Sequence, residues 1–589
     1  MEITERIITE NLDLLISAVK EKSITGRGSN KKLVLYGINK IRELILDLAM
    51  KGLLVPEDPN DEKASELVKK IGLERTKLIK DCKIKKEKGP ISFDGLHEIK
   101  KFKPIRWEWV RLSQIADVVR GGSPRPAGDP RFYDGHIPFL KVADITNNRG
   151  KLVEGFNSTI KDAGLKKTRF IDKRTVLLSN SGATLGIPAI CEFPATFNDG
   201  IAAFLEKSEF IYDEYLYLCL KNLSKWFLEV ASRGQGQPNL NTDIIKATWI
   251  PLPPVKEQKR IVEKVDKLMS LCDQLEKKQK NNIETHNILI SSLLNAFTSA
   301  TTDSSNFFQA WQPIKTNFDT LFTTEHSIDQ LKQTILQLAV TGKLVPQDLD
   351  DEPASILLDK IQREKANLLK SKKIKKTTLP NFLSNKEDLF NLPTGWEWAP
   401  LGIIGNIFNG NSISSDVKER KYTNIVGRPY LSTKDIAYGF ESPKYNTGVA
   451  IPFNESNFKI ASKNSVLICS EGGSAGKKCG IIDREICFGN KLYANQLHGN
   501  INPRFILSFY LTPLFYNQFS QLMTGIIGGV SVSKFSQIQC PLPPLAEQSR
   551  IIAKIDELLD ICEKLKENIS KKQNIQNRLA DSLAEQDFR

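Results

Sequence analysis

The chain has 589 residues, with 83 Lys and Arg against 69 Asp and Glu, which gives a formal net charge of +14. This excess fits a polyanionic partner such as DNA, although a basic protein with no nucleic-acid role would also carry it. The acidic start, the lack of an apolar run of about 18 residues and the scattered cysteines and histidines argue against export, a membrane span and a metal site, so we expect a cytoplasmic protein with reduced thiols.

The elements in chain order occur twice, at an offset of about 290 residues. A helical apolar pattern over 38–48, the turn Leu54-Val55-Pro56 and a charged helix over 64–80 recur over 328–338, at Leu344-Val345-Pro346 and over 354–370. Each series ends in a lysine cluster and continues through a polar linker to a Trp-Glu-Trp triplet. The lysines are Lys83, Lys85 and Lys86, then Lys373, Lys375 and Lys376. Two matched series indicate two copies of one unit.

After each triplet, short β-rich runs alternate with Gly, Asn and Ser turns, over about 107–250 and 396–540. An amphipathic helix closes each block, over about 213–231 and 503–523. The two copies differ in these blocks and agree outside them. The pattern therefore predicts a common frame that carries two different inserts.

A long helix with a 4-3-4-3 apolar spacing follows each insert, directly after a Pro-Leu-Pro-Pro phrase. This spacing is typical of a coiled-coil seam, and two equal seams could pair with each other. The alternative is that each seam packs on the core of its own domain. The seam residues are Ile261, Val265, Leu268, Cys272 and Leu275, then Ile551, Ile555, Leu558, Cys562 and Leu565.

The sequence offers no convincing catalytic motif. Asn502-Pro503-Arg504-Phe505 lacks the second proline of an adenine-methyltransferase loop and fits the start of a helix better. The segment from Gly472 to Lys478 misses the phosphate-loop spacing and is expected to be a turn between strands.

The doubled frame resembles the specificity subunit of type I restriction–modification systems. Its motif, Pro-Leu-Pro-Pro-x-x-Glu-Gln-x-Arg-Ile, stands at 251–261 and at 541–551. Weaker support comes from Gly121-Gly122-Ser123-Pro124 with Ile137-Pro138-Phe139, and from Gln237-Pro238-Asn239-Leu240-Asn241. The second insert departs from this pattern, with Asn409-Gly410-Asn411-Ser412 and Gly529-Val530-Ser531-Val532.

The resemblance implies a mixed α/β protein, a tandem duplication with pseudo-two-fold symmetry, in which long coiled-coil helices separate two β-rich target-recognition domains. The expected segments are a helical region (1–100), recognition domain 1 (101–250), a central helical region (251–390), recognition domain 2 (391–540) and a closing helix (541–589).

The resemblance also implies a non-catalytic subunit that reads a bipartite, asymmetric site in double-stranded DNA. It would dock two modification subunits, which use S-adenosylmethionine to methylate adenine, and restriction subunits, which use ATP and magnesium. No cofactor is expected in this chain. The alternatives are a stand-alone DNA-binding regulator and a duplicated nuclease or methyltransferase active by itself.

Base readout in the major groove needs basic, amide or hydroxyl side chains on exposed loops. Each candidate could equally be an ordinary solvated side chain. The candidates are Arg120, Ser123, Arg125, Arg131 and Lys141 in the first insert, and Asn409, Asn411, Ser412, Ser432 and Lys434 in the second.

Overall fold

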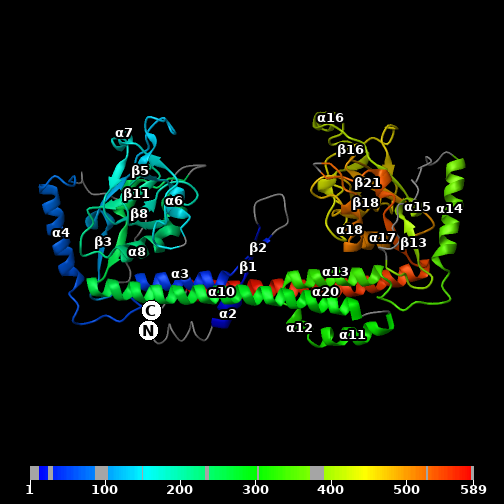
Figure 1. Ribbon diagram of the computed structural model, residues 1–589, viewed down its shortest axis with the longest axis horizontal. Helices are drawn as coiled ribbons and strands as arrows, with labels where there is room; N and C mark the ends of the chain where they lie inside the picture. The colour runs from blue at the N-terminus through cyan, green and yellow to red at the C-terminus, as the bar shows by residue number, and fades with distance from the viewer. Residues whose placement is uncertain are drawn as a thin grey trace. The chain divides into compact units, whose positions relative to one another are not determined.

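The computed structural model describes residues 12–23, 31–86, 104–148, 150–232, 238–300, 304–371, 390–525 and 528–585. The chain divides into two units, one made of residues 1–282 and 573–589 and the other of residues 283–572. Each unit combines a β-rich domain with helices (Figure 1). Among the helices of the described ranges, none combines the length and the apolar composition that a membrane span requires.

In the first unit, helices from both ends of the chain pack together. Its elements are α2 (Leu12–Ser17), the hairpin of β1 (Lys20–Ser23) and β2 (Lys31–Val34), α3 (Tyr36–Met50), α4 (Ala64–Lys80), the first part of α10 (Val255–Ala300) and the end of α20 (Leu545–Glu585). Arg42 on α3 forms ion pairs with Asp273 and Glu276 on α10, at 2.7 and 2.6 Å. Tyr36 donates to Asp581 on α20 at 2.5 Å.

The first β-rich domain contains two four-stranded sheets. One has the order β4-β11-β8-β9 and the other β6-β5-β10-β7, and β3 pairs separately with β12. The strands are β3 (Glu108–Arg111), β4 (Asp117–Arg120), β5 (Tyr133–Leu140), β6 (Thr159–Ile160), β7 (Arg169–Ile171), β8 (Thr175–Ser179), β9 (Pro188–Cys191), β10 (Ala195–Phe197), β11 (Ile201–Leu205) and β12 (Trp249–Leu252). The helices are α5 (Leu112–Ile115), α6 (Val142–Thr146), α7 (Asp162–Leu165), α8 (Asp213–Trp226), the π-helix η2 (Phe227–Ala231) and α9 (Thr242–Ala247).

The second β-rich domain repeats this topology. Its sheets have the orders β14-β21-β18-β19 and β16-β15-β20-β17, and β13 pairs with β22. The strands are β13 (Glu397–Pro400), β14 (Gly405–Asn409), β15 (Arg428–Leu431), β16 (Ala450–Ile451), β17 (Ile460–Ala461), β18 (Val466–Cys469), β19 (Cys479–Ile481), β20 (Ile486–Phe488), β21 (Leu492–Leu497) and β22 (Gln539–Leu542). The helices are α15 (Leu401–Ile404), α16 (Ser415–Lys421), η4 (Thr433–Asp435), α17 (Pro503–Tyr510), α18 (Pro513–Leu522) and α19 (Val532–Phe535). In both domains the central pair of the second sheet, β5 with β10 and β15 with β20, is parallel.

The prediction of a mixed α/β protein with two β-rich domains and long helices is confirmed. The predicted helix over 503–523 is wrong in one respect, because it is two helices, α17 and α18. Pro513 has no backbone N–H to continue α17, and the Thr512 hydroxyl accepts a hydrogen bond from Phe515 N at 3.3 Å, which starts a new helix.

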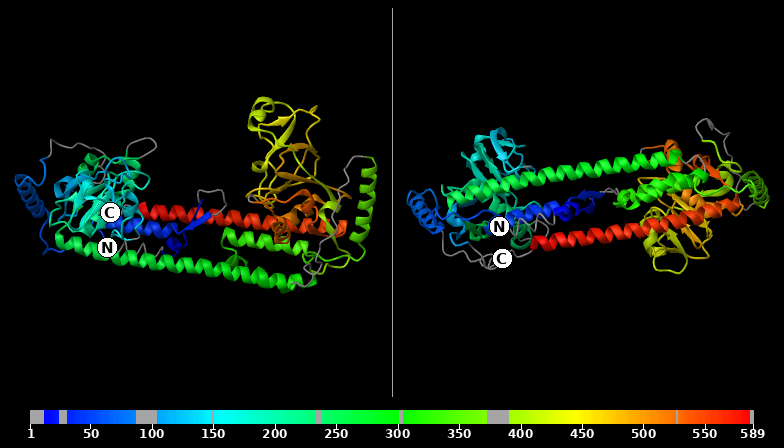
Figure 2. Two further views of the ribbon diagram at one scale, coloured as in Figure 1. Left: turned by 45° about the horizontal axis from the view of Figure 1, so that its top comes forward. Right: turned by 90° about the horizontal axis from the view of Figure 1, so that it is seen from below.

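The remaining helices of the second unit are α11 (Ser304–Thr316), α12 (Phe318–Leu321), α13 (Glu325–Val340) and α14 (Ala354–Lys370), with the last part of α10 and most of α20. In this unit α13 lies alongside α20, as Figure 2 shows, and Lys332 forms an ion pair with Glu563 at 2.6 Å. The bulk of the unit's core joins α13, α17 and α20 with strands of the domain.

The ten predicted seam residues are buried in matched fashion in the two copies. Ile261, Val265 and Cys272 are buried, as are their equivalents in α20, whereas Leu268, Leu275, Leu558 and Leu565 are half-buried. Within the second unit the α20 residues share a core with Ile328 and Leu331 of α13, so these contacts favour packing of the seam on its own copy. Pairing of the two seams with each other stays a prediction.

Candidate nucleic-acid interface

The loop that follows β4 in the first β-rich domain is held against β10 and β11. A Cβ atom at Gly121 would lie 2.2 Å from the carbonyl oxygen of Asn198, so the backbone can approach this closely only at glycine. Beyond it, the Ser123 hydroxyl donates to the Asp199 carboxylate at 2.6 Å, and Arg120 donates to the Asp199 carbonyl oxygen at 2.5 Å. The hydrogen bond from Ser123 holds the pKa of Asp199 below its usual value, so this carboxylate is charged.

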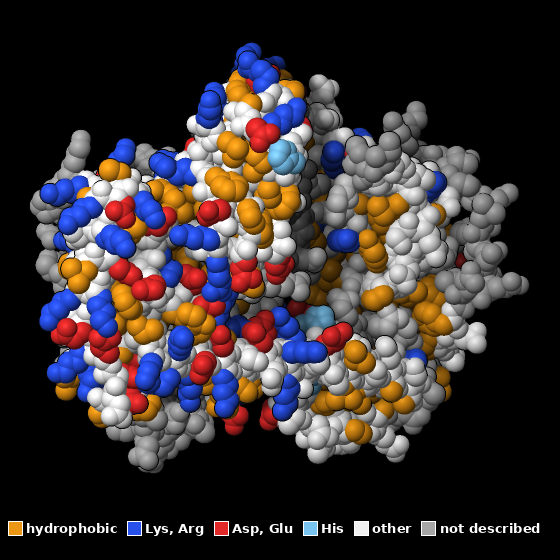
Figure 3. Space-filling view, turned by 60° about the vertical axis from the view of Figure 1, so that its left-hand side comes forward, with side chains coloured by type: hydrophobic (Ala, Val, Ile, Leu, Met, Phe, Trp, Pro, Cys, Tyr) orange, Lys and Arg blue, Asp and Glu red, His pale blue; other side chains and the backbone are white. Residues whose placement is uncertain are grey.

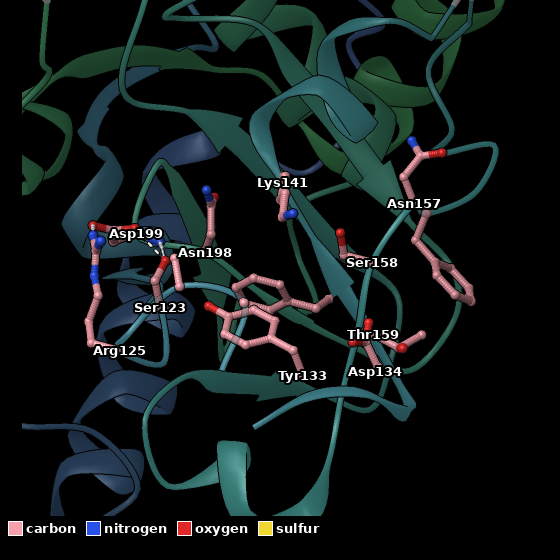
Figure 4. A pocket seen from close by; sticks show the side chains of 14 residues that line it. Ser123, Arg125, Tyr133, Asp134, Lys141, Asn157, Ser158, Thr159, Asn198 and Asp199 are labelled. Atoms are coloured by element: carbon pink, nitrogen blue, oxygen red, sulfur yellow. Dashed lines mark hydrogen bonds and ion pairs between the residues drawn. The ribbon is translucent and has the colours of Figure 1, made fainter. Parts of the chain in front are cut away.

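A pocket of about 550 Å³ opens beside this loop (Figure 4). Ser123, Arg125 and Lys141 line it together with Asp199, and the Arg125 guanidinium lies 3.9 Å from the Asp199 carboxylate. The backbone N–H of Lys141 donates to the buried Asp144 at 2.8 Å, and the Lys141 side chain lines the pocket. Three of the five candidates of this insert, Arg120, Ser123 and Arg125, therefore meet at Asp199, and Lys141 lines the same pocket as Ser123 and Arg125.

Arg131 is the exception among the five. It forms a short-range ion pair with Asp129, at 2.6 Å, and lowers the pKa of that carboxyl to about 2. Arg131 is not among the residues that line the pocket. Its side chain is 74% exposed, so it can still meet an external partner, but only in competition with Asp129.

The equivalent loop of the second β-rich domain uses its own side chains to hold itself in place. A Cβ atom at Gly410 would lie 1.9 Å from the Phe488 carbonyl oxygen, the counterpart of the close approach at Gly121. Lys459 donates from its ammonium group to the Asn409 side chain at 2.7 Å, and from its backbone to the Asn411 side chain at 2.8 Å. The side-chain oxygens of Asn409 and Asn411 thus already accept hydrogen bonds within the domain, which leaves fewer of their polar atoms for contacts with bases.

Ser432 occupies the position in the second domain that Lys141 occupies in the first. Its backbone N–H donates to Asp435 at 2.8 Å, as Lys141 does to Asp144. The Ser432 hydroxyl donates to the same carboxylate at 2.6 Å. Lys434 and Ser412 are exposed. The sequence marked Lys141 and Ser432 separately, and the structure shows that they are equivalent positions with different side chains.

The Glu-Gln-x-Arg part of the repeated motif ties distant segments together. Glu257 accepts a hydrogen bond from the indole of Trp107 at 3.0 Å, and the Gln258 side chain accepts one from the backbone of Tyr212 at 2.9 Å. Arg260 forms an ion pair with the buried Asp61 at 2.7 Å. We call this set of contacts the clip. It joins the long helix to the β-rich domain and to the loop before α4.

The second copy builds the same clip with the equivalent residues. Trp396 donates to Glu547 at 2.9 Å, Gln548 accepts from the backbone of Asn502 at 2.9 Å, and Arg550 pairs with Asp351 at 2.6 Å. The sequence showed that these phrases repeat, but it gave no role to the individual residues.

The two glutamates of the clip are buried and each has one carboxyl oxygen without a partner in the described part of the chain. Burial raises the pKa of Glu257 and of Glu547 to about 7. Loss of hydration, which disfavours the charged form, outweighs the hydrogen bond from the tryptophan.

The two segments that resemble catalytic loops have structural roles. The Asn502 side chain accepts a hydrogen bond from Arg504 N at 2.9 Å and caps α17. Residues 472–478 form the turn between β18 and β19. Both outcomes agree with the sequence analysis. Among the described residues, no group of three or more His, Cys, Asp or Glu could hold a metal ion.

The predicted lysine clusters have different outcomes. Lys83, Lys85 and Lys86 are exposed just beyond α4. Figure 3 shows that the face of the first unit that carries α4 mixes acidic with basic side chains. Lys373, Lys375 and Lys376, like Gln237, lie outside the described residues.

Comparisons with known proteins agree with this architecture. The family described as "Type I restriction modification DNA specificity domain" matches residues 104–285 and 393–574. The type I restriction enzyme EcoAI specificity subunit of Escherichia coli is 36% identical over 610 aligned residues, which cover 99% of both chains. The EcoEI specificity subunit of the same species is 33% identical with the same coverage.

Among solved structures, the HsdS subunit from Thermoanaerobacter tengcongensis is 18% identical, with a TM-score of 0.39, over 82% of this chain and 98% of that one. The family match covers more than half of the chain, and the relatives match along their whole length. The chain belongs to the specificity subunits of type I restriction–modification systems, and its two β-rich domains are the recognition domains.

Proposed function

We propose that this specificity subunit reads an asymmetric, bipartite site in double-stranded DNA, with one half-site for each β-rich domain. The observation that carries the proposal is the pair of equivalent positions on a common frame. Lys141 in one domain and Ser432 in the other follow equivalent strands, β5 and β15, and their backbone N–H groups bond equivalent buried aspartates. A lysine donates to guanine, whereas a serine hydroxyl can donate or accept. The two equivalent positions can therefore make different hydrogen bonds with base edges.

On this proposal the chain binds DNA and positions its partner subunits, which carry out the chemistry. Two modification subunits would bring S-adenosylmethionine and methylate adenine, and restriction subunits would bring ATP and magnesium. The relatives are named as subunits of type I restriction enzymes, which supports a multisubunit assembly. The segments of this chain that resemble catalytic loops have structural roles instead, since Asn502 caps α17.

The test is reconstitution of methylation in a host without other adenine methylation. The chain is co-expressed with its modification subunit, and methylated adenines are mapped across the genome. The expected result is a single bipartite motif, with no methylation when either subunit is expressed alone. A contiguous motif, or methylation by this chain alone after stringent purification, would contradict the proposal.

A further inference from the structure

The second β-rich domain has a helix where the first has none. The segment between β4 and β5, residues 121–132, contains no helix, whereas the segment between β14 and β15, residues 410–427, contains α16. In Figure 1, α16 lies at the end of its domain that is away from α17 and α18. No residue of α16 is buried.

Contacts define both ends of α16 although the helix is exposed. The Ser414 hydroxyl accepts a hydrogen bond from Val417 N at 3.4 Å at its start. At its end, the Tyr422 ring packs edge-on against Phe458, with ring centroids 5.7 Å apart, and belongs to a small core with Tyr430. Thr423 donates to the Lys418 carbonyl oxygen at 2.8 Å. The helix is therefore capped at its start and packed on the domain at its end, which gives it a defined place on the surface.

Arg420 on α16 differs from every other arginine of its domain. Arg428 pairs with Glu485 at 3.1 Å, Arg484 pairs with Asp483 at 2.8 Å, and Arg504 pairs with Asp556. In the part of the chain that the structure describes, Arg420 is exposed and has no ion-pair partner. An exposed arginine on a helix, without an ion-pair partner among the described residues, is available to bind a partner outside the chain.

The first β-rich domain places a loosely held arginine in the equivalent segment. Arg125 is 72% exposed, and its nearest carboxylate is 3.9 Å away. Each domain therefore has an exposed arginine in the segment that joins two matched strands, β4 to β5 in the first domain and β14 to β15 in the second.

We propose that α16 enters the major groove of DNA and that Arg420 reads a guanine of the second half-site. The inference rests on the proposed function and names a residue for it. An α-helix is about 10–12 Å wide and the major groove about 12 Å, so the two fit. Seven residues at about 1.5 Å each extend roughly 10 Å, which is about three base pairs at 3.4 Å. Arginine donates two parallel hydrogen bonds to guanine O6 and N7, a contact that lysine cannot reproduce in the same plane.

The experiment uses the reconstituted complex of this chain with its modification subunit, carrying Arg420→Ala or Arg420→Lys. Methylation rates are measured on duplexes that vary one base of the site at a time. In Arg420→Ala, the preference for guanine at one position of one half-site should fall by about 5- to 150-fold, while the other half-site stays unchanged. Arg363→Ala removes another exposed arginine, on α14; it is the matched control and should leave both half-sites unchanged.

Two results would overturn the inference. One is unchanged base preference at every position in Arg420→Ala. The other is equal weakening on all duplexes with a shallower salt dependence, which is the signature of a phosphate contact. Should the variant methylate nothing, binding to the same duplexes decides between these outcomes. Failure of the wild-type complex to methylate a bipartite site would instead contradict the proposed function.

Discussion

The ion pair of the clip should respond unequally to removal of its two partners. The Asp61 side chain is 2% exposed, whereas the Arg260 side chain is 33% exposed. Arg260→Met leaves a buried carboxylate without its partner, which typically costs about 3–5 kcal/mol. Asp61→Asn leaves an arginine that can turn to water, so its cost should be nearer to about 1 kcal/mol.

The assay is hydrogen exchange of the backbone amides of residues 61–67, which include the Ala64 N–H bonded to the Arg106 carbonyl oxygen at 3.0 Å. At about 1.4 kcal/mol per factor of ten, Arg260→Met should speed exchange by about 10²- to 10⁴-fold, and Asp61→Asn by about tenfold or less. Residues 351–357, where Ala354 N–H bonds the Gly395 carbonyl oxygen at 2.8 Å, are the internal control and should not change. Equal acceleration by the two substitutions would refute the asymmetry.

Three further predictions concern pH, the reading loop and the long helix. Because the pKa of Glu257 and Glu547 is raised from 4.5 to about 7, the folded chain retains protons that the unfolded chain releases, so the melting temperature should fall as pH rises from about 5 to 8. In the double variant Glu257→Gln, Glu547→Gln, the melting temperature should depend less on pH. The lost pH dependence corresponds to roughly 3 kcal/mol of unfolding free energy per carboxyl. An unchanged pH profile would contradict the buried, protonated state of the two glutamates. Gly121→Ala should abolish recognition of one half-site because its methyl group would meet the Asn198 carbonyl oxygen, whereas Gly155→Ala, with open space around it, should leave methylation intact. Four residues inserted after Glu284 lengthen α10 by about 6 Å and should widen the gap between half-sites by one or two base pairs. Methylation mapping of that variant checks this, and an unchanged gap would mean that α10 does not set the spacing.

The helical frame was largely predictable from the sequence because its signals are local. The charged helices over 64–80 and 354–370 have the bounds that were expected, since apolar spacing, a preceding turn and a terminal lysine cluster all agree. The division of the helix over 503–523 was missed, although the sequence Thr512-Pro513 is a recognisable start signal.

The clip was not predictable in the same way. Trp107 and Glu257 are 150 residues apart, and Asp61 and Arg260 are 199 residues apart, so only the folded chain brings them together. Repetition of the motif indicated importance without indicating its role.

The candidate interface was predictable only in part. Arg125 stood out as a basic residue in a Gly/Pro-rich loop and Lys141 as one on the next strand, and the structure places both at one pocket. Arg420 was overlooked because α16 is a short polar helix without apolar periodicity, which is the signal that sequence reading follows. The equivalence of Lys141 and Ser432 was hidden because the inserts have diverged, and only the hydrogen bonds to Asp144 and Asp435 reveal it.

The central claim is that the two β-rich domains read separate half-sites, and exchange of one domain tests it most directly. Residues 108–250 are replaced by the corresponding segment of a relative with a different specificity, so that the clip residues Trp107, Glu257 and Arg260 are retained. The hybrid is co-expressed with the modification subunit, and methylated adenines are mapped across the genome. The account predicts a new sequence in one half-site, with the other half-site and the gap unchanged. A change in both halves would contradict it.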